Sequence, residues 1–473
     1  MKANKEKIVL YSSFALYCIW TILSAIRHEP NVDEYHVWRM VHDLNFAELW
    51  QAMNIEGHFV LWHLLQWPFV KWLGMDYHCI YCVSVPLMML AAWLLLFKLN
   101  YNIIGKLLIL FSFPFCYHFP VVARCYALIP PILLGLAILY QQKRYPILYC
   151  VLLGLLANTH AYIEGLVAIL WCLFVYNEVI LKYKIDPKNA KRNAWTSLIT
   201  IVFVVIAFAQ VVGSLIAINE GWRPSGEGIQ SAEDWFSIFN GGYQFKSFYT
   251  IHRRFHIIPN LDVLATILAW VCVVIGTYNH IKLSKQTQWQ MYAILFFGIA
   301  WQIYFACNIY GMNWQRIGML YFVILFVLWI SYEPQNRKWT NMALIAFWLL
   351  NTSSQYVMLK DLHSNNGGDA KVAKQYEALM INDAPCYTDY LTGVHDLMNH
   401  KFAYTRFDIY DSIATEKAIN EFTDSTGNCY LLIMAPILVE ENKWNIDTLV
   451  ALDHIEYGYH LYYIEKPNAK VLE

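Results

Sequence analysis

Two adjacent carboxylates, Asp33 and Glu34, follow an apolar run at 8–26 that is long enough to cross a bilayer. They lie in the stretch NVDEYHVWRM, where a membrane helix would emerge into water. A carboxylate within hydrogen-bond reach of a hydroxyl group can take its proton as the oxygen attacks. Asp33 and Glu34 are therefore candidate catalytic residues, with Asp33 as a general base and Glu34 orienting it or binding the acceptor.

Each acid also has a structural interpretation, which the sequence leaves open. Asp is a favoured N-cap residue, so Asp33 could cap a helix that starts near Glu34. Glu34 could equally be a solvated neighbour of Asp33. The chemistry of this pair therefore depends on what other residues the fold brings to the same side of the membrane.

The composition is that of a membrane protein. Of the 473 residues, 58% are hydrophobic and only 15% are charged, and the net charge of −1 gives no basis for bulk nucleic-acid binding. We expect about eleven transmembrane helices, the first of them retained rather than cleaved as a signal peptide. The apolar runs lie at 8–26, 79–97, 106–122, 126–140, 146–158, 162–181, 195–217, 262–279, 289–309, 317–331 and 339–357.

A twelfth apolar run at 59–73 decides the topology. It is short and contains His63, Lys71 and a proline. If it does not span, every short loop on one side is basic, and the positive-inside rule makes that side the cytoplasm. If it does span, all later loops invert and the pattern fails. We therefore expect an interfacial helix in the first outer loop, with the N-terminus cytoplasmic and the C-terminus extracytoplasmic.

The basic residues that define the cytoplasmic side are Lys2, Lys5, Lys7, Lys98, Lys106, Lys143, Arg144, those of LKYKIDPKNAKR (181–192), Lys282, Lys285, Arg337 and Lys338.

The chain divides into an all-α membrane domain at 1–357 and a polar region at 358–473. In that region CYLLIMA reads as a buried strand and AKVAKQYEALM as an amphipathic helix, which predicts a small extracytoplasmic α/β domain. Cys386 and Cys429 are its two cysteines. They could form a disulfide outside the cytoplasm if the fold brings them close.

Polar residues gather on the outward side of this topology. Arg124 and Arg316 stand at two helix tips among apolar residues, and His160 and Glu164 stand at a third. A charge at a membrane boundary marks a site, a partner or a snorkelling anchor. Arginines together with a carboxylate and histidines on one face suggest a base and a cationic clamp for a phosphate.

These residues form an ordered series that resembles the GT-C superfamily of membrane glycosyltransferases. The nearest likeness is to protein O-mannosyltransferases, the lipid A aminoarabinose transferase and their bacterial relatives, over roughly 8–330. This likeness favours a bacterial inner membrane as the location. The series is Asp33-Glu34 after the first span, EGHFVLW (56–62), RCYAL (124–128), THAY (159–162) and QR (315–316).

The resemblance implies a reaction and assigns roles to residues. Such enzymes take a sugar from a polyprenyl phosphate on the outer face and pass it to a hydroxyl or phosphate acceptor, usually with inversion. The Asp of the first-loop pair is their expected base, and that role falls on Asp33. The lipid phosphate leaves as a stable anion, so it needs cationic and amide donors rather than a proton. Candidates for donor binding are Arg124, Tyr126, His160, Tyr162, Arg253, Arg254 and Arg316.

A divalent metal is a further option, although no cofactor is required by the sequence. Glu56 and His58 have ligand chemistry that suits zinc or manganese, and His252 or His256 could complete the shell. Their spacing matches no tight metal motif.

Two other functions remain open. A transporter or flippase of lipid-linked glycans would show ionisable residues near mid-membrane and related halves, and neither is visible. A polymerase of the O-antigen type would also use lipid-linked donors and outward arginines. The paired acids favour the transferase.

Overall fold

The computed structural model describes most of the chain. The described residues are 2–28, 30, 32–56, 59–219, 261–285, 287–309, 314–351, 358, 369–381, 383–388, 398, 402–404, 412–424, 427–433, 444–452 and 459–466. Contacts divide the chain into two units. The helical unit is Met1–His28 with Met40–Ser364, and the sheet unit is Glu29–Arg39 with Asn365–Glu473.

Helices form almost all of the helical unit. The division into units falls inside α2 (Val32–Asp43), after Arg39. The other α-helices are α1 (Lys2–Arg27), α3 (Phe46–Glu56), α4 (Leu61–Trp67), α5 (Tyr81–Trp93), α6 (Ile103–Leu110), α7 (Phe119–Val121), α8 (Ile129–Gln142), α9 (Pro146–Ala157), α10 (Glu164–Phe174), α11 (Leu181–Tyr183), α12 (Pro187–Asn219), α15 (Leu261–Leu283), α16 (Gln288–Asn308), α17 (Trp314–Ile330) and α18 (Arg337–Asn351).

Several helices have the length and composition of membrane spans, which makes this a multi-pass membrane protein. Within the described residues six helices qualify, or seven if the bent pair at 103–121 is one span. Three shorter apolar helices lie at Pro146–Ala157, Ile267–Leu283 and Met319–Ile330. The expected count of about eleven is therefore not confirmed, although the polytopic helical architecture is.

The run at 59–73 is too short to cross a bilayer. It forms α4, of seven residues, and a π-helical turn at Pro68–Trp72, of five. At 1.5 Å per residue the two together reach about 18 Å, against about 30 Å of hydrocarbon. A run of this length does not span, as the distribution of basic loops requires. Its interfacial placement stays a prediction.

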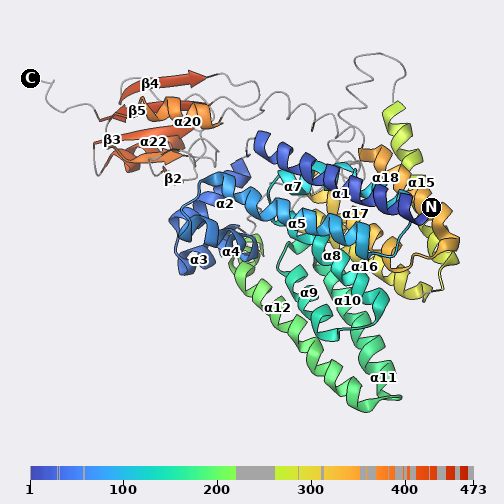
Figure 1. Ribbon diagram of the computed structural model, residues 1–473. Coiled ribbons are helices and arrows are strands. Elements are labelled where there is room, and N and C mark those ends of the chain that lie inside the picture. Colours follow the sequence, from blue (N-terminus) through green and yellow to red (C-terminus); the bar gives the residue numbers. More distant parts are fainter. Residues whose placement is uncertain are drawn as a thin grey trace, which may run out of the picture. The chain divides into compact units, whose positions relative to one another are not determined.

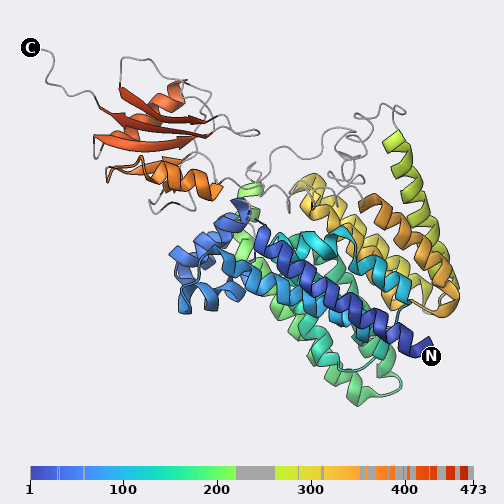
Figure 2. The same ribbon diagram turned by 45° about the horizontal axis from the view of Figure 1, so that its top comes forward.

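Two helices form the centre of the helical unit. The side chains of α17 from Met319 to Ile330 are all buried, and α8 is buried over most of its length. A helix that is apolar all round belongs inside a bundle. Around them α9 lies beside α10 and α12 (Figures 1 and 2). Gly154 of α9 faces the Phe203 ring of α12, and Gly165 of α10 faces Trp301 of α16. These small residues let each pair of helices approach closely.

The sheet unit has helices on both faces of a five-stranded mixed sheet, in the order β2-β1-β3-β5-β4. Its helices are α20 (Asp369–Glu377) and α22 (Ser412–Thr423). β1 pairs in parallel with β2 and β3, while β5 pairs antiparallel with β3 and β4. The strands are β1 (Cys386–Thr388), β2 (Phe402–Tyr404), β3 (Asn428–Ile433), β4 (Asn445–Leu452) and β5 (Tyr459–Glu465).

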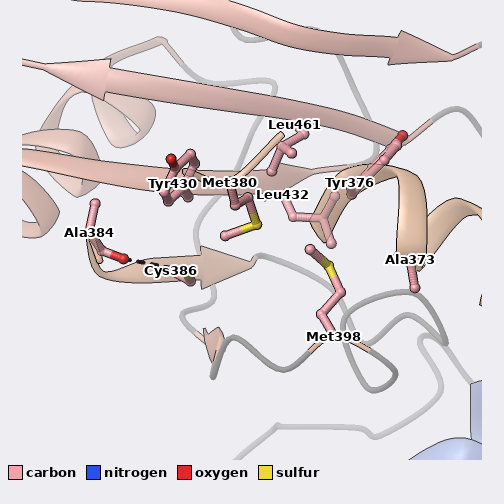
Figure 3. Packing of buried hydrophobic residues seen from close by; sticks show 9 residues of the cluster. All are labelled: Ala373, Tyr376, Met380, Ala384, Cys386, Met398, Tyr430, Leu432 and Leu461. Atoms are coloured by element: carbon pink, nitrogen blue, oxygen red, sulfur yellow. Dashed lines mark hydrogen bonds between the residues drawn. The ribbon is translucent and has the colours of Figure 1, made fainter. Parts of the chain in front are cut away.

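Strand β3 supplies both hydrophobic cores of this unit, because successive side chains point to opposite faces. Tyr430 and Leu432 pack with Tyr376 of α20 in one cluster (Figure 3). Cys429 and the other β3 side chains on its face of the sheet pack with Phe422 of α22 in the second cluster. A strand buried on both faces explains why CYLLIMA is apolar without alternation.

The same alternation separates the two cysteines. Cys386 lies opposite Tyr430 in the register of β1 and β3 and belongs to the α20 cluster, whereas Cys429 belongs to the α22 cluster. Both thiols are free, and burial raises the pKa of each to about 12. The sheet thus lies between the two sulfurs, which leaves no geometry for a disulfide.

We predict that Cys386 and Cys429 are unpaired and slow to alkylate in the folded protein. With a pKa of about 12, roughly one thiol in 10⁴ is ionised at pH 8, and thiolate is the reactive form. Peptide mapping after iodoacetamide treatment at pH 8 without reductant should show both unlabelled. In denaturant both should be labelled. A linked pair of cysteine peptides would contradict the opposite-face arrangement.

A second prediction concerns the crossing of α10 and α16. A Cβ at Gly165 would overlap the Cβ of Trp301 and lie 2.6 Å from its Cγ. Gly165→Ala should therefore destabilise the protein by about 1–3 kcal/mol through overpacking, measured as a lower thermal midpoint in detergent. Gly135→Ala is the control, since its Cβ would meet only the end of the Leu152 side chain, at 3.0 Å. Equal effects in the two variants would contradict this packing.

Candidate functional site

The paired acids lie in the first turn of α2. The helix begins at Val32, so Asp33 lies inside the first turn rather than at the N-cap. Carboxylates there stabilise the helix through its dipole, whatever else they do. The two side chains differ in access, because Asp33 is half-buried and Glu34 is completely buried. Only Asp33 is open to a partner that arrives from solvent.

Within the helical unit, a broken helix determines the shape of the end that bears Arg124. Residues 103–121 form two helical pieces that meet at 52°, with a π-helical segment at Pro114–His118. In that segment Phe119 N–H bonds to Pro114 O, so Phe115 O would pair with residue 120, which is a proline without an N–H. The Tyr17 hydroxyl donates to Phe115 O instead, at 2.8 Å.

The break brings His118 against the turn that starts α8. We define the ring row as His118, Tyr126, His160 and Tyr162, whose ring centroids follow one another at 6.1, 5.2 and 5.5 Å with interplanar angles of 25°, 35° and 34°. All four side chains are buried. They come from three separate segments, so the row exists only in the folded chain.

Arg124 lies over this row. Its guanidinium carbon is 5.9 Å from the centre of the Tyr126 ring, and only 7% of the residue is exposed. An arginine buried at the end of a membrane helix is costly unless anionic or aromatic partners stabilise the charge. Arg124 and the ring row therefore combine a cation with flat surfaces, which is chemistry suited to a phosphate beside a sugar ring.

His160 has a defined orientation. Its Nδ1 accepts a hydrogen bond from the backbone N–H of Tyr162 at 3.2 Å and so caps the short helix at Ala161–Ile163. The neutral ring then carries its proton on Nε2, which acts as a donor. Trp301 of α16 donates from Nε1 to Ala161 O at 2.8 Å, and Phe305 packs edge-on against Tyr162 at 4.8 Å. These contacts fix the turn that bears His160 and Tyr162.

An apolar cavity of about 340 Å³ lies beside this turn, between α10, α12 and α16. Glu164 is its one carboxylate, and it is buried. Within the described part of the chain, no group donates a hydrogen bond to its Oε1. The other lining residues are Gly165, Val167, Ala168, Trp171, Thr200, Ile201, Val204, Phe208 and Trp301.

The structure thus brings together Arg124, Tyr126, His160 and Tyr162 of the expected donor-binding residues. Arg253, Arg254 and His58 lie outside the described residues. Arg316 lies in α17 and Glu56 ends α3, but their side chains are outside the described part as well. Across the described ranges no three His, Cys, Asp or Glu side chains are grouped to hold a metal ion, and the pair Glu56–His58 is untested by this.

His118 is the residue that the sequence patterns missed. It lies inside the apolar run at 106–122, which has the hydropathy of one continuous membrane span. The signal that would reveal it is the pair Pro114 and Pro120 in SFPFCYHFP, because two prolines this close interrupt a membrane helix. Backbone interrupted at membrane depth is usually buried in protein or beside a cavity, and His118 lies in such a segment.

The similarity of this chain to known proteins is confined to solved structures. No protein-family model matches the sequence, and no curated protein does. Among solved structures the chain resembles the crystal structure of ArnT from Cupriavidus metallidurans bound to undecaprenyl phosphate, with 10% identity, a TM-score of 0.47 and 98% of each chain covered. The crystal structure of the same protein in the apo state has 11% sequence identity and a TM-score of 0.40, with 98% of each chain covered.

ArnT is a lipid A aminoarabinose transferase of the GT-C superfamily. At about 10% identity and TM-scores below 0.5, the likeness carries no argument about the function of this chain.

Proposed function

We propose that this protein is an integral-membrane glycosyltransferase. It moves a sugar from a polyprenyl-phosphate donor to an acceptor on the outer face of the membrane, with inversion at the anomeric carbon. The observation that carries the proposal is Arg124, a cation buried at a helix tip and set against the ring row. A lipid phosphate is an anion that a guanidinium group binds through charge-assisted hydrogen bonds.

The donor half of the proposal uses the ring row. The leaving lipid phosphate takes charge-assisted hydrogen bonds from Arg124, and the Nε2–H of His160 is a further donor. Tyr126 and Tyr162 offer hydroxyl groups and ring faces to the sugar. The apolar cavity beside Glu164 has walls suited to an isoprenoid chain. Arg253, Arg254 and Arg316 stay candidates for further phosphate contacts.

The acceptor half uses the acids of α2. Asp33, half-buried, accepts the proton of the attacking hydroxyl group, while Glu34, fully buried, orients Asp33. Inversion follows from a single displacement in which the acceptor attacks opposite the phosphate. The polar region at 358–473 is then an extracytoplasmic domain beyond the membrane domain at 1–357, and the N-terminus is cytoplasmic.

The general base is tested by Asp33→Asn. Loss of the proton acceptor should slow transfer roughly 10²- to 10⁴-fold while the amount of folded protein stays the same. The measurement is transfer in membranes from a panel of polyprenyl-phosphate sugars. Asp43→Asn, at the other end of α2, is the matched control because its carboxylate pairs with the exposed His42. Normal turnover by Asp33→Asn would reduce Asp33 to a helix-stabilising residue.

The donor clamp is tested separately by Arg124→Ala and Arg124→Lys. Charged hydrogen bonds contribute about 1.5–3 kcal/mol each, so Arg124→Ala should weaken donor binding roughly 10- to 100-fold. Arg124→Lys keeps the charge and should recover part of the loss. Donor affinity is measured by displacement of a labelled polyprenyl phosphate.

Arg192→Ala removes an exposed arginine of α12 and serves as the control for loss of charge. If Arg124→Ala binds donor as the wild type does, Arg124 is an anchor and the phosphate site lies elsewhere.

A further inference from the structure

A second cavity, which is polar, lies at the opposite end of α8 from Arg124. It measures about 320 Å³ and is surrounded by the ends of α8, α9 and α10 and the start of α16. With about 1.5 Å per residue, the 14 residues of α8 separate the two ends by about 21 Å. The lining residues are Leu139, Tyr140, Lys143, Arg144, Pro146, Tyr149, Leu173, Phe174, Asn177, Glu178, Lys182, Thr287 and Gln290.

The charges of this cavity are unbalanced. Three cations, Lys143, Arg144 and Lys182, face one carboxylate, Glu178. Glu178 forms an ion pair with Lys182 and also receives a hydrogen bond from Asn193 at 3.4 Å. In the described part of the chain, Lys143 and Arg144 have no ion pair, so the cavity carries a net positive charge at its rim.

The interior of the cavity is rigidly built. Gln290 Oε1 accepts from the Tyr140 hydroxyl at 3.1 Å and from Asn177 Nδ2 at 3.3 Å, while Gln290 Nε2 donates to Asn177 Oδ1 at 2.9 Å. The rings of Tyr149 and Phe174 stack beneath at 5.6 Å. Hydrogen bonds across three helices define the cavity, which distinguishes it from a solvated row of surface lysines.

The backbone that bears the cations is unusual. Lys143 ends α8 with φ at 51°, and Tyr145 precedes α9 with φ at 59°. Glycine is the usual residue where a helix ends in the left-handed region, and a side chain there costs about 1 kcal/mol. A lysine in this position therefore has a cost to stability that binding by its side chain would offset.

Aromatic side chains of the kind that collect at the bilayer interface adjoin the cavity. Tyr176 and Trp289 adjoin its lining, pack edge-on at 5.4 Å and are 37% and 49% exposed. Tyrosine and tryptophan collect at the bilayer interface. Ile147 and Leu148, just past Pro146, are also exposed. Apolar surface beside a cationic cavity suits a ligand that has both a phosphate and acyl chains.

We propose that this cavity binds the phosphate of an anionic phospholipid, with its acyl chains over the exposed apolar surface of α9. Lys143 and Arg144 contact the phosphate, and the Gln290–Asn177 amides shape the floor beneath the headgroup. Basic cavities between membrane helices on the cytoplasmic side hold anionic headgroups in this way. The proposal is independent of the transferase reaction, because it uses the other end of the helices.

The test is lipid retention by the full chain in a neutral detergent, followed by native mass spectrometry. Phosphatidylglycerol is titrated against phosphatidylcholine for the wild type and for the double variant Lys143→Gly with Arg144→Gln. Glycine fits the left-handed backbone, so the variant should fold. At about 1 kcal/mol for each basic residue, phosphatidylglycerol should bind roughly 30-fold more weakly to the variant. Phosphatidylcholine should bind weakly to both proteins.

The control variant is Lys98→Gln with Lys338→Gln, which removes two charges from the same predicted side of the membrane and should retain phosphatidylglycerol like the wild type. Equal retention by all three proteins, or equal binding of the two lipids, would overturn the proposal. A third arm adds inorganic phosphate at the lipid concentration. Displacement of phosphatidylglycerol by it would assign the cavity to a soluble anion and also overturn the lipid assignment.

Discussion

The end of the helical unit that bears Arg124 depends on one constraint, which is that backbone polar groups buried in a membrane must find partners within the protein. The prolines at 114 and 120 remove two N–H donors from the segment at 103–121. Tyr17 and Ser84 supply hydroxyl groups to Phe115 O and Pro120 O, both at 2.8 Å. These two bonds tie the broken helix to α1 and α5 and make the bend tolerable in a lipid environment.

The ring row follows from that bend. A straight helix over 103–121 would carry His118 onward along its axis, whereas the 52° bend that precedes Pro114 places its ring beside Tyr126. The turn after α9 is fixed separately, by the His160 cap and the Trp301 bond. Arg124 then lies over Tyr126 between two rigid supports. In the proposed reaction, a guanidinium group that is held before the phosphate arrives loses little entropy on binding, which is the advantage of preorganisation.

Patterns of hydropathy and charge predicted much of the fold. They gave the helical spans at 8–26, 79–97 and 126–140, and the strand and helix of the sheet unit appear as β3 and α20. They did not give the break at 103–121, because proline barely lowers a hydropathy average while it removes a hydrogen bond. They also could not place Cys386 and Cys429, since strand register depends on contacts far apart in the chain.

The candidate site was harder to predict than the fold, for a physical reason. Polar residues at the tips of membrane helices have a free-energy cost, so they are rare and the sequence alone can select them. The residues selected in this way are Arg124, Tyr126, His160 and Tyr162. Which of them touch is a tertiary property, and so is the burial of Glu34 beside the accessible Asp33.

In α8, too, charged residues lie only next to the two ends of the helix. It begins shortly after Arg124, and it stops at Lys143 in a left-handed turn. Between them the helix is almost entirely apolar, so each end is a place where charge can be kept without crossing the hydrocarbon. One end lies among buried rings and the other at a hydrogen-bonded cavity. In the two proposals above, a single buried helix therefore positions one cationic site near each of its ends.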